Sequence, residues 1–348
     1  MKAEGDQELT FMARAWALAL KSCGHTRPNP PVGAVVVQGG RIVGEGRHRR
    51  CGGDHAEAAA LKDATRRLPG IDFHTAAPAT VYCTLEPCSK PGRVGACCDA
   101  LIAAGVKRVV WACPDPNPTN RGRAARVLRR AGIDTACWAQ ERSVARRTLA
   151  RDIWATTLRP FAKHVTTGLP YVTVKLALSL DGRICDTMGQ ARWISGPASL
   201  RETATWRERA DVVLVGAETV RRDNPSLLCH TRRNDDLWRA VVSRSGNLPQ
   251  DAQIFTDAAK DRTLVYRDPV EAVRDLGARG FMSVLCEGGF GLARALADAD
   301  LVDEWVSILC PLVIGERPLA DARRFLPQPP AVRGGDLFST SLRRADPF

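Results

Sequence analysis

The sequence predicts an α/β protein with two domains in tandem. The chain has 348 residues, 45% of them hydrophobic, which is enough to build two ordinary cores. Strand-like and helix-like periodicities alternate along both halves, as is typical of sheets covered by helices. The stretches Arg159-Pro160 and Gly168-Leu169-Pro170 mark a boundary near the middle. We therefore expect domains at 1–150 and 169–348, joined by a linker at 151–168.

The first half alternates helix and strand in the order α-β-β-α-β-α-β-α-β. Its opening helix is expected at 9–21, where Phe11, Met12 and Trp16 lie near helical spacing. Two strands follow around the Gly39-Gly40 turn. Strands are expected at 32–37, 41–46, 80–85, 106–112 and 133–137, and helices at 56–67, 96–104 and 121–130. This order predicts a mixed sheet with helices on both faces.

The second half is also expected to be α/β, with a different fold from the first because no internal repeat relates the two. Its strands are expected at 171–178, 211–215, 240–242, 263–266, 282–286 and 304–309, with helical patterns between several of them. No further strand is expected before the end of the chain.

Charge and cysteine content restrict the class of partner and the compartment. The net charge is +12, and residues 1–147 hold 23 Lys and Arg against 13 Asp and Glu. A basic half favours an anionic partner, either a phosphorylated metabolite or nucleic acid, although arginines at helical spacing often form a solvated face. The acidic first residues do not resemble a signal peptide, and no apolar run is long enough to span a membrane. We expect a cytoplasmic protein whose twelve cysteines are reduced.

Three residues have the chemistry of a catalytic zinc site. They are His55, in His55-Ala56-Glu57, then Cys88, which follows Pro87, and finally Cys97. One imidazole and two thiolates leave a fourth tetrahedral position for water, whereas structural zinc sites use four protein ligands. Zinc-dependent nucleobase deaminases carry H-x-E…P-C-x-x-C, but here nine positions separate the cysteines. Cys98 and, more weakly, Cys51 are alternative ligands.

Glu57 is the expected proton shuttle of this site. A metal lowers the pKa of its bound water, and a carboxylate that is not a ligand can carry the released proton to a departing amine. The same three zinc ligands are compatible with two other classes of protein, an RNA or nucleoside deaminase and a binding protein with a structural zinc. A structural site has no use for Glu57. We expect Glu86 to support the loop rather than to act in catalysis.

A second site is indicated by Glu287-Gly288-Gly289-Phe290-Gly291. This segment follows an expected strand and opens a helix, so its backbone amides could hold a phosphate. A short glycine run is also compatible with a simple turn.

Motifs along nearly the whole chain resemble those of the bifunctional riboflavin-biosynthesis deaminase–reductases. In the first half they are Pro28-Asn29-Pro30-Pro31-Val32-Gly33, His55-Ala56-Glu57, Thr84-Leu85-Glu86-Pro87-Cys88-Ser89, Cys97-Cys98-Asp99-Ala100-Leu101 and Asp115-Pro116-Asn117-Pro118. In the second half they include Lys175-Leu176, Ser179-Leu180-Asp181-Gly182, Trp193-Ile194-Ser195, Asp223-Asn224-Pro225 and Glu287-Gly288-Gly289. The nine-residue separation of the two cysteines is the spacing of that family.

The resemblance implies a cytidine-deaminase-like mixed-sheet domain fused to a dihydrofolate-reductase-like α/β domain. The first domain would deaminate a diaminopyrimidinone that carries a ribose phosphate, and the second would use NADPH to reduce the ribosyl group to ribityl. One zinc per chain would be held by His55, Cys88 and Cys97, with Glu57 as the catalytic residue. The resemblance assigns NADPH to Ala177, Trp193, Thr219, Asp223, Gly289 and Gly291, and substrate to Asn29, Arg207, Leu227, His230 and Glu287.

Some positions depart from the family pattern. Lys90-Pro91 and Val94-Gly95-Ala96 replace a histidine and Thr-Pro-Pro between the cysteines, His230 replaces an arginine, and Ser243-Arg244 replaces Asp-Ser. These positions concern ligand contacts rather than the metal or Glu57. They leave open a deaminase of a related pyrimidine with a degenerate reductase domain. We expect the chain to bind a phosphorylated small-molecule substrate and to form a homo-oligomer, and we expect it to bind neither nucleic acid nor a membrane.

Overall fold

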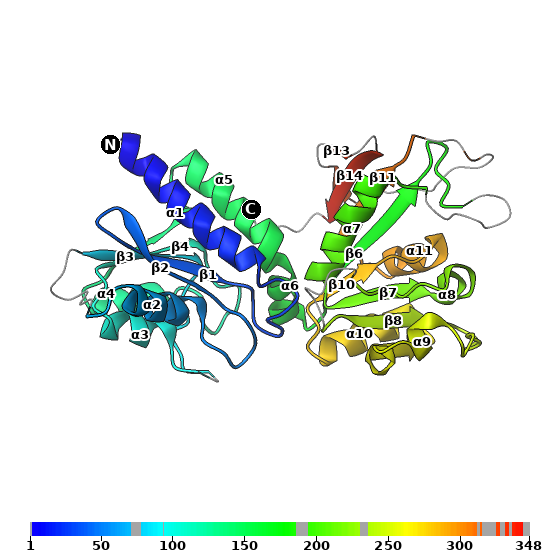
Figure 1. Ribbon diagram of the computed structural model, residues 1–348, viewed down its shortest axis with the longest axis horizontal. Coiled ribbons are helices and arrows are strands. Elements are labelled where there is room, and N and C mark those ends of the chain that lie inside the picture. The colour runs from blue at the N-terminus through cyan, green and yellow to red at the C-terminus, as the bar shows by residue number, and fades with distance from the viewer. Residues whose placement is uncertain are drawn as a thin grey trace. The chain divides into compact units, whose positions relative to one another are not determined.

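The computed structural model divides the chain into two compact units, Met1–Thr167 and Gly168–Phe348 (Figure 1). It describes residues 2–70, 78–92, 94–185, 194–229, 236–311, 314, 325–327, 331–333 and 336–343. The segment before the division is helical throughout. It consists of α5 (Val144–Ile153), a π-helical turn (Trp154–Leu158) and α6 (Arg159–Thr167).

The first unit is built on a five-stranded mixed sheet. Its strands are β1 (Gly33–Gln38), β2 (Arg41–Arg47), β3 (Ala79–Leu85), β4 (Arg108–Cys113) and β5 (Asp134–Cys137). They lie in the order β2-β1-β3-β4-β5. β1 is antiparallel to β2 and β3, whereas β3, β4 and β5 are parallel to one another. Every strand expected in this half is present within a few residues of its expected bounds.

Helices cover both faces of this sheet (Figure 1). Besides α5 they are α1 (Lys2–Leu20), α2 (Ala56–Arg67), α3 (Cys97–Ala103) and α4 (Arg123–Arg130). α1 and α5 pack on one face, and α2, α3 and α4 lie side by side on the other. The starts of α2 and α3 thus lie on the same face of the sheet.

Two glycines let helices lie directly on strands. A Cβ atom at Gly33 would lie 2.0 Å from the carbonyl oxygen of Ala15 in α1, and one at Gly46 would lie 2.2 Å from that of Ala56 in α2. No larger residue fits at either position without moving a helix. The first turn of α2, which carries Glu57, is therefore fixed against β2.

The second unit is built on a larger sheet whose centre is parallel. Its strands are β6 (Tyr171–Leu178), β7 (Val212–Gly216), β8 (Trp238–Val242), β9 (Thr263–Tyr266), β10 (Ser283–Cys286), β11 (Glu304–Leu309), β12 (Phe325–Pro327), β13 (Ala331–Arg333) and β14 (Asp336–Arg343). The order is β12-β14-β11-β6-β10-β7-β8-β9, with β13 paired to β14. The strands from β11 to β9 in this order are parallel, and β14 is antiparallel to β11.

One expectation about this sheet is wrong, because the chain does form strands after residue 309. β14 pairs with the full length of β11, from Glu304 opposite Leu342 to Leu309 opposite Leu337. The centre of β14 is Ser339-Thr340-Ser341, which gives no local apolar alternation. It is the pairing with β11 that makes this segment a strand.

Helices also cover both faces of the second sheet. They are α7 (Pro197–Arg209), α8 (Ala217–Asp223), α9 (Gln253–Thr256), α10 (Pro269–Ala278) and α11 (Phe290–Asp298). Val212 and Leu214 of β7 pack with side chains of α10 and α11, whereas Val213 and Val215 pack with those of α7, α8 and α9. Successive residues of a strand point to opposite faces, so this alternation explains the continuous apolar run of β7.

The chain diverges at the centre of this sheet, where β7 and β10 are neighbours. After β7 it passes through α8 to β8 on one side, and after β10 it passes through α11 to β11 on the other. Ligands of α/β proteins bind outside the carboxyl ends of the strands at such a switch point.

All twelve cysteines are free thiols. None of the helices in the described ranges combines the length and the apolar character that a membrane span requires.

Candidate metal centre and cofactor cavity

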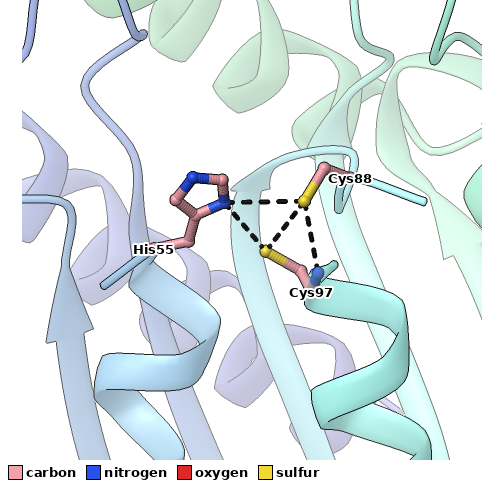
Figure 2. Close-up of side chains that lie close together, drawn as sticks. All are labelled: His55, Cys88 and Cys97. Carbon is pink, nitrogen blue, oxygen red and sulfur yellow. Dashed lines mark hydrogen bonds between the residues drawn. The ribbon is translucent and has the colours of Figure 1, made fainter. Parts of the chain in front are cut away.

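Three potential metal ligands converge in the first unit. His55 directly precedes α2, Cys88 lies in the loop after β3, and Cys97 is the first residue of α3. The Nδ1 atom of His55 lies 3.1 Å from Sγ of Cys97 and 3.5 Å from Sγ of Cys88, and the two Sγ atoms are 3.3 Å apart. Figure 2 shows the three side chains pointing toward one another from three separate segments.

This donor set fits zinc. Tetrahedral zinc with bonds of about 2.3 Å to sulfur and about 2.0 Å to nitrogen separates its donor atoms by about 3.5–3.8 Å, close to the distances above. Three protein ligands leave one position open, as in catalytic zinc sites. Within the described ranges, no other group of three or more His, Cys, Asp or Glu could hold a metal ion. The alternatives Cys51 and Cys98 are not part of the group.

The charges of the two thiols differ before any metal binds. Hydrogen bonds from Cys97 and His55 lower the pKa of Cys88 despite its burial, whereas the hydrogen bond with Cys88, together with burial, raises the pKa of Cys97. The hydrogen bond with Cys88 also raises the pKa of His55. Cys88 therefore loses its proton first, which places a negative charge where a divalent cation would bind.

Glu57 lies beside these donors without belonging to them. It is in the first turn of α2, is only 3% exposed, and interacts with Cys97. Burial raises the pKa of its carboxyl group. A buried carboxyl group next to the ligands, but outside the donor set, is suited to moving protons.

Asn29, which was expected to contact the pyrimidine, is held by the buried His48. Nδ1 of His48 donates to the carbonyl oxygen of Asp54 at 2.9 Å, so that Nε2 can accept from Nδ2 of Asn29 at 3.1 Å. The His48 ring packs edge-on against His55, with ring centroids 5.2 Å apart. Burial lowers the pKa of His48 and thus favours the neutral ring that this arrangement requires. His48 gave no signal in the sequence, because its partners lie in two other segments.

Glu86 supports the loop next to the metal ligands. Its carboxylate accepts hydrogen bonds from the backbone N–H groups of Asp115 at 3.1 Å, Gly122 at 3.1 Å and Ala124 at 3.2 Å. These contacts fix the connection between β4 and α4. The geometry agrees with the structural role expected from the sequence.

The second unit contains a cavity of about 550 Å³ where the chain diverges between β7 and β10. Ligand sites commonly have volumes of about 300–1,000 Å³. Thr219, Asp223, Gly289 and Gly291, four of the residues assigned to the cofactor, line this cavity. Two arginines, Arg222 and Arg244, line it as well.

The glycines at and next to this cavity suit it to a phosphate group. A Cβ atom at Gly288 would lie 2.8 Å from Cδ2 of Leu292 and 3.3 Å from the backbone nitrogen of Gly216. A side chain at position 288 would therefore displace the end of Leu292 and crowd the backbone of Gly216, where the segments after β7 and β10 meet. Gly289 is the N-cap of α11, and the N-terminal N–H groups of a helix favour phosphate.

Three charged side chains, from α7, from β6 and from the segment after β10, form a cluster in the second unit. The guanidinium of Arg207 donates from Nε and Nη2 to the two carboxylate oxygens of Glu287, at 2.6 and 3.0 Å. Nζ of Lys175 lies 4.0 Å from Oε2 of Glu287. Burial lowers the pKa of Lys175 against the opposing effect of Glu287. Lys175 was not among the residues assigned to the site, although a lysine in the apolar strand at 171–178 is a signal for a buried functional charge.

Two other assigned residues, Ala177 and Leu227, lie outside this cavity. Ala177 packs near Ile308 and Cys310 and does not line the cavity. Leu227 is 2% exposed, has a φ of 57° and belongs to the core on the α7 side of the sheet. Trp193 and His230 lie outside the described residues.

Comparison with known proteins identifies a protein family for each unit. The cytidine and deoxycytidylate deaminase zinc-binding region matches residues 6–113, and the RibD C-terminal domain matches residues 170–332. The riboflavin biosynthesis protein RibD of Escherichia coli K12 is 35% identical, over 91% of this chain and 90% of its own length. The chain belongs to the RibD family.

Other members of the RibD family give the same result. RibD of Mycobacterium tuberculosis H37Rv is 37% identical over 84% of this chain and 81% of its own. The Thermotoga maritima diaminohydroxyphosphoribosylaminopyrimidine deaminase/5-amino-6-(5-phosphoribosylamino)uracil reductase has a TM-score of 0.85 at 30% identity, covering 97% of this chain and 99% of that one. For RibD of Acinetobacter baumannii the TM-score is 0.80 at 31% identity, covering 97% and 99%. The predicted fold class, a deaminase-like domain fused to a reductase domain of the RibD type, is confirmed.

Proposed function

We propose that this chain catalyses two successive reactions of riboflavin biosynthesis. As a RibD it is a bifunctional enzyme, with a zinc-dependent deaminase domain and an NADPH-dependent reductase domain. The substrate of the first reaction is diaminohydroxyphosphoribosylaminopyrimidine, as in the Thermotoga maritima protein. The observation that carries this proposal is the group of His55, Cys88 and Cys97 beside a buried Glu57, in a chain whose second half is a RibD C-terminal domain.

Hydrolytic deamination consumes water and releases ammonia. Zinc held by His55, Cys88 and Cys97, one ion per chain, would activate water for attack on the ring carbon that bears the amine. Glu57 accepts a proton from this water and donates it toward the leaving amine. Because Glu57 is only 3% exposed, the proton stays within the site between the two transfers.

Asn29 orients the pyrimidine. Its amide nitrogen is directed toward His48 by the hydrogen bond at 3.1 Å, and His48 is in turn held by Asp54. The orientation of the Asn29 carboxamide is therefore set before substrate binds. A preset hydrogen-bonding group discriminates between pyrimidines more sharply than one that must reorient.

The cavity of the second unit would hold NADPH, which would supply the hydride for reduction of the ribosyl group. The N-terminus of α11 after Gly289 would hold the phosphates, and Thr219 and Asp223 line the same cavity. Arg222 and Arg244 add positive charge at its lining. A guanidinium pairs well with the extra phosphate that distinguishes NADPH from NADH.

Lys175 supplies the proton for this reduction. The ribosyl carbon gains a hydride after the sugar ring opens, and the oxygen released from the ring must gain a proton. The Lys175 side chain is 12% exposed beside Glu287, and burial lowers its pKa, so its ammonium group gives up a proton more readily than a solvated lysine. Arg207 holds Glu287 in place.

We further propose a cytoplasmic homo-oligomer. Twelve free thiols suit a reducing compartment. A groove next to the 68% exposed Val144 is lined by Leu9, Ala13, Ala145 and Leu149 together with the polar Thr10, Thr148 and Asp152. A second copy of the chain would cover its apolar part. Light scattering of the purified chain measures the mass, and a monomer at micromolar concentration would contradict the oligomer.

The direct test is to incubate the zinc-loaded chain with diaminohydroxyphosphoribosylaminopyrimidine, with and without NADPH. We expect one ammonia per substrate in both cases and one NADPH oxidised per substrate when the cofactor is present. Ammonia release without NADPH oxidation would limit the function to deamination. No ammonia from a zinc-loaded chain would contradict the deaminase assignment.

A further inference from the structure

The carboxamide of Asn120 binds the peptide groups on both sides of Cys88. Asn120 is 7% exposed and lies in the loop between β4 and α4. Its Nδ2 donates to the carbonyl oxygen of Pro87 at 3.3 Å, and its Oδ1 accepts from the backbone N–H of Ser89 at 2.9 Å. The hydroxyl of Ser89 donates to the same oxygen at 3.0 Å. One side chain thus bridges the residue before Cys88 and the residue after it.

The carboxamide is itself held by Asp115. Nδ2 of Asn120 also donates to Oδ2 of Asp115 at 2.8 Å. An asparagine side chain has two N–H donors and an oxygen that accepts two hydrogen bonds, and here all four are used. Asp115 accepts from the backbone N–H of Asn117 at 2.8 Å and donates its own N–H to Glu86 at 3.1 Å. The orientation of Asn120 is therefore fixed from the β4–α4 loop.

Besides the contact of its Sγ with His55, Cys88 is held by backbone groups of α3. The backbone N–H of Cys98 donates to the carbonyl oxygen of Cys88 at 3.1 Å, and that of Cys97 donates to its Sγ at 3.2 Å. Cys88 lies in a loop without regular secondary structure, so hydrogen bonds must set the position of its thiol. Asn120 supplies bonds to this loop from an element that carries no metal ligand.

We propose that Asn120 is a positioning residue for the zinc ligand Cys88. This inference rests on the proposed zinc site. Without Asn120, the Pro87 carbonyl, the Ser89 N–H and an Asp115 oxygen would lose a partner, and zinc binding would have to order the loop. Residues that orient metal ligands typically change metal affinity about 10- to 100-fold when replaced. Asn120 acts through Cys88 and does not touch the metal.

The test compares Asn120→Ala with Thr119→Ala in the full-length chain. Thr119 is the adjacent residue and its hydroxyl bonds only to Asn117 among the described contacts, so its replacement alters the same loop without touching the Cys88 segment. Zinc affinity is measured by competition with a colorimetric chelator, and the alkylation of Cys88 by iodoacetamide is measured in the zinc-free protein. We expect Asn120→Ala to weaken zinc binding about 10- to 100-fold and to alter the alkylation rate. Thr119→Ala should stay within about twofold of the parent.

A purely structural role would give a different result. It would lower the unfolding temperature of zinc-free Asn120→Ala and leave its zinc affinity and Cys88 alkylation equal to those of the parent, which would overturn the proposal. If Asn120→Ala does not fold, Asn120→Ser, which puts a shorter polar side chain in place of the carboxamide, carries the same test. Cys88→Ala distinguishes a failure of the proposed zinc site from a failure of the positioning role of Asn120. Full zinc retention in Cys88→Ala would refute the zinc site itself, whereas zinc loss there with parental affinity in the Asn120 variant would refute only the positioning role.

Discussion

Arg207 and Glu287 form a two-point ion pair that joins α7 to the segment between β10 and α11. The side chains of Arg207 and Glu287 are only 18% and 9% exposed. The next two residues are Gly288 and Gly289, and Gly289 lines the cofactor cavity. The pair therefore fixes the backbone that would meet the cofactor phosphates.

Removing one partner of this pair should be costly. Arg207→Leu leaves the Glu287 carboxylate buried, with Lys175 as its remaining charged neighbour among the described residues, and breaking a buried ion pair typically costs about 3–5 kcal/mol. We expect a loss in that range in the free energy of unfolding of the second unit. Urea denaturation, monitored by hydrogen exchange of the amides of β10, measures this free energy. Arg207→Leu/Glu287→Gln should recover part of the loss, and a single-variant effect below about 1 kcal/mol would contradict the buried pair.

Acid should weaken the same interaction. Burial alone would raise the pKa of Glu287, but the charge and hydrogen bonds of Arg207 and the charge of Lys175 hold it below its usual value. A carboxylate with a lowered folded-state pKa stabilises the protein above its unfolded pKa of about 4.3, and this contribution disappears as the pH falls through the folded value.

The difference in unfolding free energy between the parent and Glu287→Gln should consequently be largest at neutral pH and should shrink below about pH 4.3. Urea denaturation of both proteins between pH 7 and pH 3 provides the comparison. A difference that stays constant over this range would show that the ionisation of Glu287 does not stabilise the fold.

The regular elements with strong local patterns were predictable from the sequence. The helix at 56–67 and the strand at 171–178 have the expected bounds, because helical periodicity and an apolar run are local properties. Cys97 opens α3 as expected. β14 was missed because its pairing with β11 is a long-range contact. Arg159-Pro160 suggested a break in the chain, but α6 begins there, since proline is tolerated in the first turn of a helix.

The supporting residues of the sites were less accessible to sequence reasoning. The group of His55, Cys88 and Cys97 could be recognised because its residue types and spacing are diagnostic. His48 and Asn120 could not, since each acts through hydrogen bonds to segments far along the chain. A buried polar residue acquires its role only when the fold brings its partners to it.

Arg244 should set the preference for NADPH. It lines the cavity after β8 and is exposed, so a phosphate could reach its guanidinium. We expect Arg244→Ala to weaken NADPH binding about tenfold or more, since hydrogen bonds to charged groups contribute about 1.5–3 kcal/mol, and to leave NADH binding nearly unchanged. Fluorescence titration with both cofactors measures this. Arg294→Ala, whose side chain is 79% exposed and paired with Asp298, is the matched control. Equal losses for both cofactors would contradict the assignment.

Glu57→Gln should retain zinc and lose ammonia release. The amide keeps the shape of the side chain but cannot accept the proton of the attacking water, and general acid–base groups contribute about 100- to 10,000-fold. Zinc content by metal analysis and ammonia by a coupled assay are the two measurements. A loss smaller than about tenfold with full zinc occupancy would exclude Glu57 as the proton carrier.

The central claim is that one chain carries two separate active sites, and mixing two variants tests it most directly. Glu57→Gln should lack deamination, and Lys175→Met should deaminate the substrate but fail to reduce the product. An equimolar mixture of the two, given diaminohydroxyphosphoribosylaminopyrimidine and NADPH, should release ammonia and oxidise NADPH to form the ribityl product, although neither variant does so alone. If the mixture releases ammonia but oxidises no NADPH, the two reactions do not use independent sites and the account is wrong.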